Sequence, residues 1–123
     1  MPPGGNAVKI IIAGDGKVGL SLTQMLSEEG HDLTLIDSNQ RVLDSSVERY
    51  DVMGVQGNCA SMRVLVSADV QHADLLIAAT SLDEVNLLCC MTAQGLNSKL
   101  HTIARIRNPE YGKQIFTMRD VYK

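Results

Sequence analysis

The sequence predicts an α/β fold: a doubly wound parallel sheet of the Rossmann type, with five strands and with helices on both faces. Two observations carry this prediction. Short, continuously apolar runs alternate along the 123 residues with helical patterns, most of them about 8 to 14 residues long. Continuous apolar runs are typical of parallel strands that are covered on both faces. The right-handed crossover rule then favours the doubly wound arrangement.

Five apolar runs are the expected strands, and with the helices between them they make one domain over residues 8–123. A chain of this length fits a single domain. Residues 1–7, MPPGGNA, are rich in Pro and Gly and lack periodicity, so we expect a flexible leader. The expected strands are Val8–Ala13, Leu33–Ile36, Val52–Gln56, Leu75–Thr80 and Thr102–Ile106.

The first two helices follow from apolar spacing and from their end signals. Between Gly16 and Gly30, apolar residues recur at steps of three and four, which predicts an amphipathic helix that ends at the second glycine. Ser38 precedes the second expected helix, which extends from Asn39 to about Arg49.

Two later helices have sequence signals at their starts. The segment from Ser81 to Glu84 has the form of a capping box, with Ser81 at the N-cap, and the helix after it is expected to end near Gly95. Pro109 is expected at the first position of the final helix, where its missing N–H group costs nothing.

Composition excludes several classes of protein. Only four residues are aromatic, so the core is expected to be aliphatic and no platform exists for stacking single-stranded bases. The net charge of -3 argues against a nucleic-acid partner. No apolar run approaches the roughly 20 residues of a membrane span, so we expect no direct membrane insertion.

Cys59, Cys89 and Cys90 lack a disulfide or metal-site spacing, which indicates reduced thiols in a cytoplasm. The adjacent pair is expected to be buried in a helix.

The strongest motif is the G-x-G-x-x-G from Gly14 to Gly19, which directly follows an apolar strand and opens an amphipathic helix. Gly14 would permit the tight turn, Gly16 would let a pyrophosphate approach the backbone, and Gly19 would let the helix pack closely on the sheet. The helix dipole would favour the phosphate charge. The alternative is a tight turn that binds nothing.

All six residues of this loop, Val18 included, are candidate cofactor-binding residues. Asp15 is expected to be a turn residue that faces solvent, because a carboxylate beside a pyrophosphate would be unfavourable. The positive charge of Lys17 lies at the positive end of the helix dipole, which is unfavourable. Lys17 is therefore either a contact of the phosphate or an exposed surface lysine.

Asp37 follows the second expected strand, about 20 residues after the glycine loop, where an acid accepts hydrogen bonds from an adenosine ribose. Its charge would repel a 2'-phosphate, so the predicted cofactor is NAD or NADH rather than NADP. The neighbouring Ser38 is a further candidate. Arg41 would weaken that preference if it met a phosphate, and it is otherwise a solvated residue on the helix face.

The segments 8–39 (VKIIIAGDGKVGLSLTQMLSEEGHDLTLIDSN), 78–86 (AATSLDEVN) and 104–111 (ARIRNPEY) resemble the N-terminal nucleotide-binding domain, also called RCK or TrkA-N, of Trk/Ktr-type potassium-uptake regulators. The resemblance covers essentially the whole chain after residue 7. It implies a cytoplasmic protein, peripheral to the inner face of the cell membrane, that senses NAD(H) and gates a potassium transporter. It also implies a homodimer or higher homo-oligomer, with a membrane transporter subunit as partner.

The resemblance also implies further contacts of the nucleotide. Asn58 and Cys59 match a loop that flanks the adenine, Thr80 lies at the tip of the fourth strand, and Arg105 matches a position near the phosphates or the nicotinamide. All of these follow strand ends, where ligands bind in open α/β sheets. The family continues into a sixth strand beyond Lys123, so we expect a fragment or one domain of a longer protein.

Two other functions remain open on the sequence. The glycine loop and Asp37 would also suit the cofactor-binding half of an NAD-dependent dehydrogenase or, less well, a domain that binds S-adenosylmethionine. No catalytic acid–base pair is found near the predicted site, because His31, His72 and His101 are expected on the opposite side of the sheet. We therefore predict a regulator that is not an enzyme. ATP or ADP is not distinguished from NAD(H) by these residues.

Overall fold

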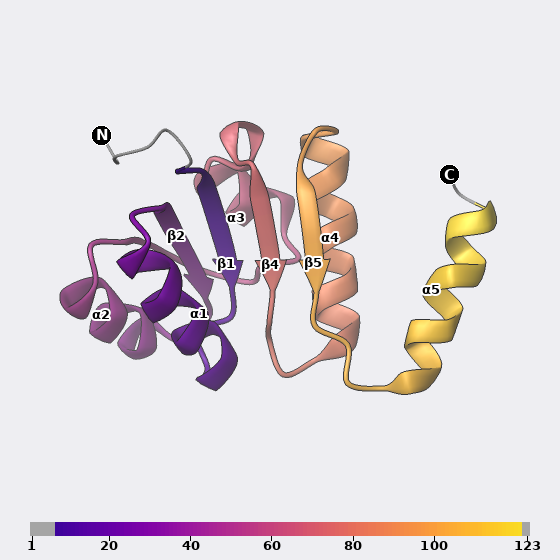
Figure 1. Cartoon of the computed structure of the whole chain (residues 1–123), viewed down its shortest axis with the longest axis horizontal. Helices are drawn as coiled ribbons and strands as arrows, with labels where there is room; N and C mark the ends of the chain where they lie inside the picture. Colours follow the sequence, from indigo (N-terminus) through magenta and orange to yellow (C-terminus); the bar gives the residue numbers. More distant parts are fainter. Residues whose placement is uncertain (1–6, 122–123) are drawn as a thin grey trace.

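The computed structural model describes the backbone of residues 7–121 and the side chains of residues 7–115. Nearly all of the predicted leader lies outside the described residues. Five parallel strands form one sheet in the order β3-β2-β1-β4-β5, which confirms the predicted doubly wound fold (Figure 1). The strands are β1 (Lys9–Ala13), β2 (Asp32–Asp37), β3 (Met53–Gln56), β4 (Leu75–Ala78) and β5 (His101–Ala104).

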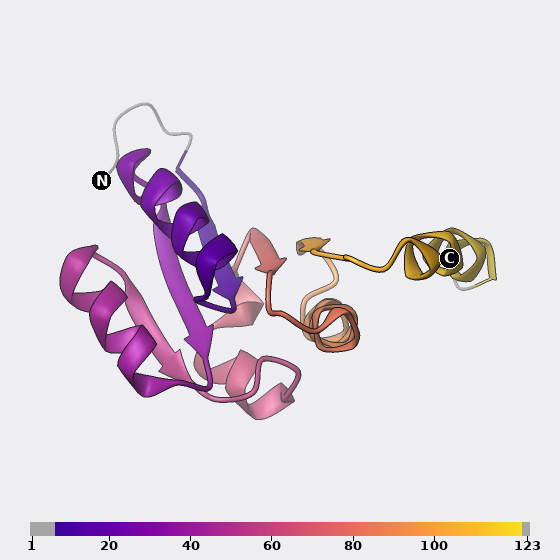
Figure 2. The same cartoon turned by 90° about the horizontal axis from the view of Figure 1, so that it is seen from below.

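Helices cover both faces of the sheet, as predicted. Helices α1 (Lys17–Glu28) and α2 (Gln40–Arg49) lie on one face, and α3 (Met62–Ser67) and α4 (Asp83–Leu96) lie on the other (Figure 2). A short 3-10 helix, Val70–His72, joins α3 to β4. Alternate residues of the strands therefore point into two cores, and both cores are aliphatic. The α1/α2 core includes Ile10, Ile12, Leu33, Leu35 and Leu43, and the α3/α4 core includes Ile11, Leu65, Val70, Leu76 and Cys89.

The strand register places the carboxyl ends of the strands along one edge of the sheet, called the carboxyl edge below. Ala13 pairs with Ile36 on one side and with Ala78 on the other, and Ala78 in turn pairs with Ala104. The loops that follow all five strands therefore emerge at this edge, where open α/β sheets bind ligands.

Two strands end earlier than predicted. The strand β4 was expected to reach Thr80 but ends at Ala78, because the N–H group of Thr80 donates to the side chain of Asn86 instead of to β1. The strand β5 ends at Ala104 rather than Ile106, after a last backbone hydrogen bond from Arg105 to Ala78. In both cases, hydrogen bonds with a side chain of α4 replace the hydrogen bonds between strands.

The predicted N-cap of α4 is wrong. The helix begins at Asp83, Leu82 occupies the N-cap position, and Ser81 is exposed. The Thr80 hydroxyl accepts a hydrogen bond from the Leu82 N–H group, so the chain turns around Thr80 and the helix starts later. Helix α2 begins at Gln40, one residue later than expected, because Asn39 caps it with its side chain. Pro109 opens α5, as expected.

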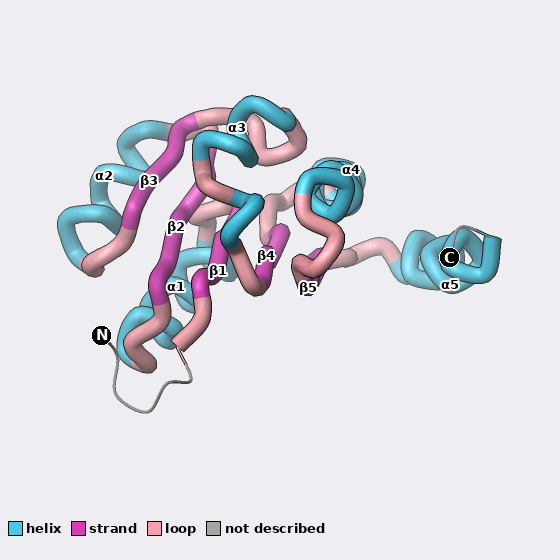
Figure 3. The backbone as a smooth tube through the Cα atoms, turned by 90° about the horizontal axis from the view of Figure 1, so that it is seen from above, coloured by secondary structure: helices cyan, strands magenta, loops and turns pink. Residues whose placement is uncertain are grey.

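Helix α5 (Pro109–Val121) does not cover the sheet. Figures 1 and 3 both show it set apart from the other elements, on the far side of α4 from β1. Among the described residues, no helix is long and apolar enough to cross a bilayer.

Candidate functional site

A cavity of about 620 Å³ opens at the carboxyl edge, between the loops that follow the strands. Nearly all of the predicted site residues line it, although they come from five separate parts of the sequence. These are Gly14, Gly16, Lys17, Val18, Asp37, Ser38, Asn58, Cys59, Thr80 and Arg105. The two predicted site residues that do not line the cavity are Asp15 and Gly19. Residues that the sequence did not indicate also contribute, namely Ile36, Gly57, Ala79, Ser81, Leu82 and Val85.

The three glycines of the loop have different structural roles. Gly14 adopts a φ of +101°, and a Cβ there would lie 2.9 Å from the backbone nitrogen of Thr80. A Cβ on Gly19 would collide with the carbonyl oxygen of Gly14, so this glycine allows α1 to approach the loop. Gly16 faces open space, with nothing within 4 Å of a Cβ. Gly14 and Gly19 therefore shape the loop, while Gly16 leaves room for a ligand.

The N-terminus of α1 points at this open space. The first N–H groups of a helix have no partner within the helix, and Gly16 supplies no side-chain cap to them. Lys17 is exposed at the same position and lines the cavity. Unpaired N–H groups, the positive end of the helix dipole and a lysine together suit an anion such as a phosphate group.

The Asp37 carboxylate, which also lines the cavity, is held in place by backbone groups of the glycine loop and of the start of α2. Its Oδ2 accepts from the N–H of Asp15 at 2.8 Å, and its Oδ1 accepts from the N–H of Asn39 at 2.8 Å. Its carbonyl oxygen accepts from Gly57. Each carboxylate oxygen has a second lone pair, so a fixed acceptor remains for hydroxyl groups of a ligand.

Asp15 does not face solvent as predicted, because its side chain turns inward between α1 and α2. The residue is 3% exposed and lines a separate cavity of about 300 Å³ with Ser46, Arg41 and Tyr50. The Ser46 hydroxyl donates to its Oδ2 at 2.6 Å, while its Oδ1 has no hydrogen-bond partner among the described residues. Burial, and to a smaller extent the charge of Asp37, raises the pKa of Asp15 above its usual value. The hydrogen bond from Ser46 holds the side chain in this orientation, while the backbone N–H group of Asp15 binds Asp37.

The loop after β3 forms the third wall of the cavity. Gly57 has a φ of +153°, and a Cβ there would lie 2.6 Å from a methyl group of Val64. The side-chain oxygen of Asn58 accepts from the N–H of Ala60, which leaves its amide group available to the cavity. Cys59 is 5% exposed.

The three cysteines are free and buried, and they belong to one core cluster. A hydrogen bond with the Cys89 thiol lowers the pKa of Cys59, and the same bond, together with burial, raises the pKa of Cys89. Burial raises the pKa of Cys90 to about 11. The prediction that Cys89 and Cys90 are buried helix residues is confirmed.

The fourth wall depends on Asn86, which the sequence analysis did not single out as a site residue. Asn86 is fully buried in α4, and its side chain binds both Thr80 and the carbonyl oxygen of Arg105. The only sequence signal was an amide at a position where the helix pattern would accept an apolar residue. Such a buried amide requires several polar partners.

The titratable residues that line the cavity are Lys17, Asp37, Cys59 and Arg105. His31, His72 and His101 lie before β2, before β4 and at the start of β5, which places them at the opposite edge of the sheet, as expected. In the part of the chain that the structure describes, no three His, Cys, Asp or Glu residues come together as a metal site.

Residues 10–121 match the family model of the TrkA-N domain. The chain belongs to the TrkA-N domain family. This confirms the family that the glycine loop and the later segments indicated.

This TrkA-N domain has relatives among potassium-uptake proteins. It is 41% identical over 104 residues to the Trk system potassium uptake protein TrkA of Haemophilus influenzae, an alignment that covers 85% of this chain and 23% of the relative. The domain thus spans about a quarter of that relative's length.

Solved structures share the fold of this TrkA-N domain. The Kef CTD of Shewanella denitrificans in its AMP-bound form superposes with a TM-score of 0.78 at 24% identity, covering 89% of this chain and 66% of the other. The GsuK channel bound to NAD superposes with a TM-score of 0.77 at 23% identity, covering 94% of this chain and 21% of the other.

Proposed function

We propose that this TrkA-N domain binds NAD or NADH in the carboxyl-edge cavity, and that the protein to which it belongs regulates a membrane potassium transporter in response. The observation that carries the proposal is the position of the Asp37 carboxylate, which binds the glycine loop through the N–H group of Asp15 and lines the same cavity as the open N-terminus of α1. A dinucleotide has a ribose and a pyrophosphate to match these two groups.

Each part of the ligand has a candidate partner. The pyrophosphate would lie against Gly16 and Lys17, where N–H groups and a cation are available. The adenosine ribose hydroxyls would donate to Asp37, and the adenine would lie beside Asn58 and Cys59. Thr80 and Arg105 would then face the second half of the dinucleotide. The cavity volume of about 620 Å³ is within the ordinary range for small-molecule sites.

The comparisons support the wider role. Relatives such as the Haemophilus influenzae protein are potassium-uptake proteins, and one structure of the same fold is a channel bound to NAD. We therefore propose a cytoplasmic regulator at the inner face of the cell membrane, which assembles as a homodimer or higher homo-oligomer beside its transporter subunit. The absence of a histidine in the cavity favours a sensor over an NAD-dependent dehydrogenase.

One specific observation favours a second candidate ligand. The Kef CTD has the same fold and is described in an AMP-bound form, so an adenosine mononucleotide such as ATP, ADP or AMP is the alternative. It would use Asp37 and the glycine loop in the same way but would leave Arg105 without a nicotinamide half to face.

A thermal-shift panel of NAD, NADH, NADP, ATP, ADP, AMP and S-adenosylmethionine tests the proposal, because a ligand that binds only the folded domain must raise its melting temperature. We expect NADH or NAD to give the largest shift. Gly16→Val should abolish that shift, since the added side chain would occupy the phosphate space.

Gly95→Val is the matched control for Gly16→Val. A Cβ at Gly95 also meets nothing within 4 Å, but this glycine lies in α4 and does not line the cavity. The control should keep the ligand-induced shift. A shift that survives in Gly16→Val would show that the pyrophosphate does not bind at this loop.

A further inference from the structure

The first turn of α4 contacts both the cavity and the segment that leads to α5. This turn contains Asp83, Glu84 and Asn86. Asn86 is completely buried and Asp83 is 8% exposed, although both are polar. Buried polar side chains are costly unless they are hydrogen-bonded, so their partners indicate what they hold in place.

Asn86 joins the ends of two strands at the cavity wall. Its Oδ1 accepts from the N–H group of Thr80 at 2.9 Å and from the Thr80 hydroxyl at 2.7 Å. Its Nδ2 donates to the carbonyl oxygen of Thr80 at 3.1 Å and to that of Arg105 at 2.8 Å. Thr80 and Arg105, which both line the cavity, are therefore linked by one side chain.

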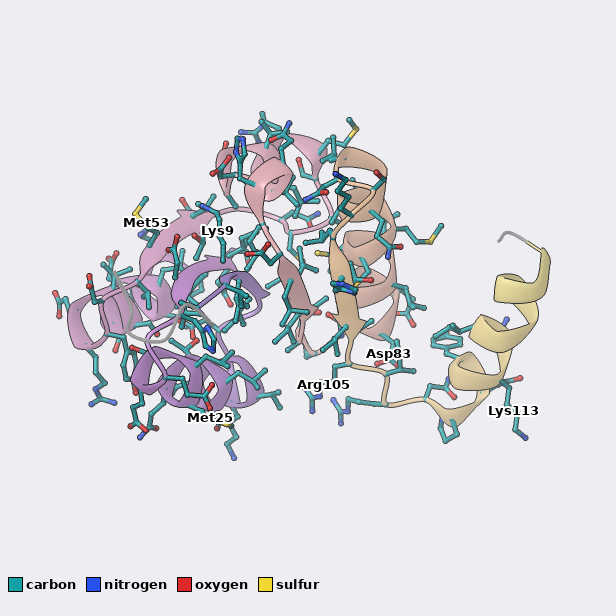
Figure 4. All side chains as sticks on the ribbon, turned by 45° about the horizontal axis from the view of Figure 1, so that its top comes forward. Lys9, Met25, Met53, Asp83, Arg105 and Lys113 are labelled. Carbon is teal, nitrogen blue, oxygen red and sulfur yellow. The ribbon has the colours of Figure 1, made fainter. Side chains whose placement is uncertain are left out.

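Asp83 and Glu84 extend this connection to α5. The Asp83 carboxylate accepts from the backbone N–H groups of Arg107 at 2.9 Å and Asn108 at 2.8 Å, which are the last residues before the helix. Glu84 and Tyr111, which is in the first turn of α5, line one groove, and the neighbouring Glu84 carboxylate raises the pKa of Tyr111. Figure 4 shows Asp83 between Arg105 and α5.

Helix α5 has little other support from the domain. It stands apart from the sheet in Figures 1 and 3. Tyr111 and Ile115 of α5 line one groove with Leu88 and Met91 of α4, and Tyr111 lines a second groove with the first turn of α4 and the loops beside it. The direction of α5 therefore depends on the first turn of α4 and on residues 105–108.

We propose that the first turn of α4 is a junction through which an occupied cavity fixes the start of α5, with Asn86 as the positioning residue. This inference rests on the proposed nucleotide site. A ligand that contacts Thr80 and Arg105 restrains both ends of the Asn86 network, and Asp83 carries that restraint to Arg107 and Asn108. Because coupling is reciprocal, holding α5 in place would also strengthen ligand binding.

Hydrogen exchange of the whole chain, with and without NADH, tests the junction. Binding should slow exchange of the amides in residues 105–112 by roughly fivefold or more. These amides are protected from exchange only while the segment remains bound to the first turn of α4. In Asn86→Ala, NADH should bind roughly tenfold more weakly. At saturating NADH, the slowing in residues 105–112 should be lost.

Asn97→Ala is the matched control, because Asn97 is also an amide at an end of α4. Its Nδ2 donates to the carbonyl oxygens of Val70, Gln71 and Ala73, and it lies at the end of α4 remote from the cavity. This variant should lose stability as Asn86→Ala does. It should nevertheless keep the wild-type NADH affinity, and NADH should still slow hydrogen exchange in residues 105–112.

Asp83→Ala separates coupling from binding if Asn86→Ala does not fold. It should still bind NADH measurably, because Asp83 does not line the cavity, but the slowing should be absent. The junction would be overturned if NADH still slowed hydrogen exchange of residues 105–112 in Asp83→Ala or Asn86→Ala. It would also be overturned if NADH bound the wild type without slowing exchange in those residues. If NADH does not bind the wild type at all, the proposed function falls and the junction falls with it.

Discussion

Asp15 combines burial with an unsatisfied charge. One carboxylate oxygen accepts from Ser46 and the other has no partner among the described residues, while Asp37 lies close by. The folded state therefore favours the protonated form, and the pKa of Asp15 is raised. A carboxyl group of this kind reduces stability as the pH rises from the pKa of the unfolded chain through that of the folded chain, and the loss persists above.

Asp15→Asn tests this account at the residue scale. The amide keeps an oxygen for Ser46 but carries no charge, so the melting temperature of the variant relative to the wild type should be a few degrees higher at about pH 7 than at about pH 4. Melting curves of both proteins at the two pH values provide the measurement. An identical difference at both values would show that Asp15 is not a buried carboxylate with a raised pKa.

Single residues show what sequence alone could predict about the site. Gly14 and Asp37 were predicted because their spacing from strand ends is set by local chain geometry. The orientation of Asp15 was not, because it depends on Ser46, which is distant in sequence and approaches only when α2 packs beside α1. Asn86 was missed for the same reason, since its partners Thr80 and Arg105 come together only in the sheet.

At the scale of elements, the packing of α1 against the glycine loop depends on one missing side chain. A Cβ on Gly19 would collide with the Gly14 carbonyl oxygen, which is backbone and cannot rotate away. Gly19→Ala should therefore destabilise the domain by about 1–3 kcal/mol, as overpacking does, and should also displace the first N–H groups of α1.

Gly95→Ala is the control for this prediction, because a Cβ at Gly95 in α4 meets nothing within 4 Å. The same substitution there should be neutral or slightly stabilising, because alanine favours helix. Urea denaturation of the two variants provides the comparison. Equal stabilities would mean that α1 can move away from the loop at no cost.

The elements themselves were largely predictable, and the differences have one physical origin. Apolar runs and helix signals located all five strands and the starts of α2 and α5. The predicted ends of β4 and β5 and the predicted start of α4 were wrong because backbone groups there form hydrogen bonds with the side chains of Asn86 and Thr80. These bonds replace those of the sheet ladder and of a capping box. Such competition between side chain and backbone leaves no periodic signal.

At the scale of the whole molecule, the doubly wound sheet was predicted with the help of the crossover rule, whereas the place of α5 was not predicted. Its sequence predicts a helix but does not say which surface it covers, and the structure sets it apart from the sheet. The proposed nucleotide site also belongs to the whole domain, because the groups that would form it come from five loops and Asp37 would recognise the adenosine ribose.

Isothermal titration of NADH into the wild type, Asp37→Ala and Asp74→Ala tests this claim most directly. Asp74 is a matched control, since its carboxylate also accepts from a backbone N–H group, that of Lys9 at 2.8 Å, but at the opposite edge of the sheet. We predict saturable binding to the wild type and to Asp74→Ala, and affinity at least roughly tenfold weaker for Asp37→Ala. No saturable binding to the wild type, or equal affinities for the wild type and Asp37→Ala, would contradict the account.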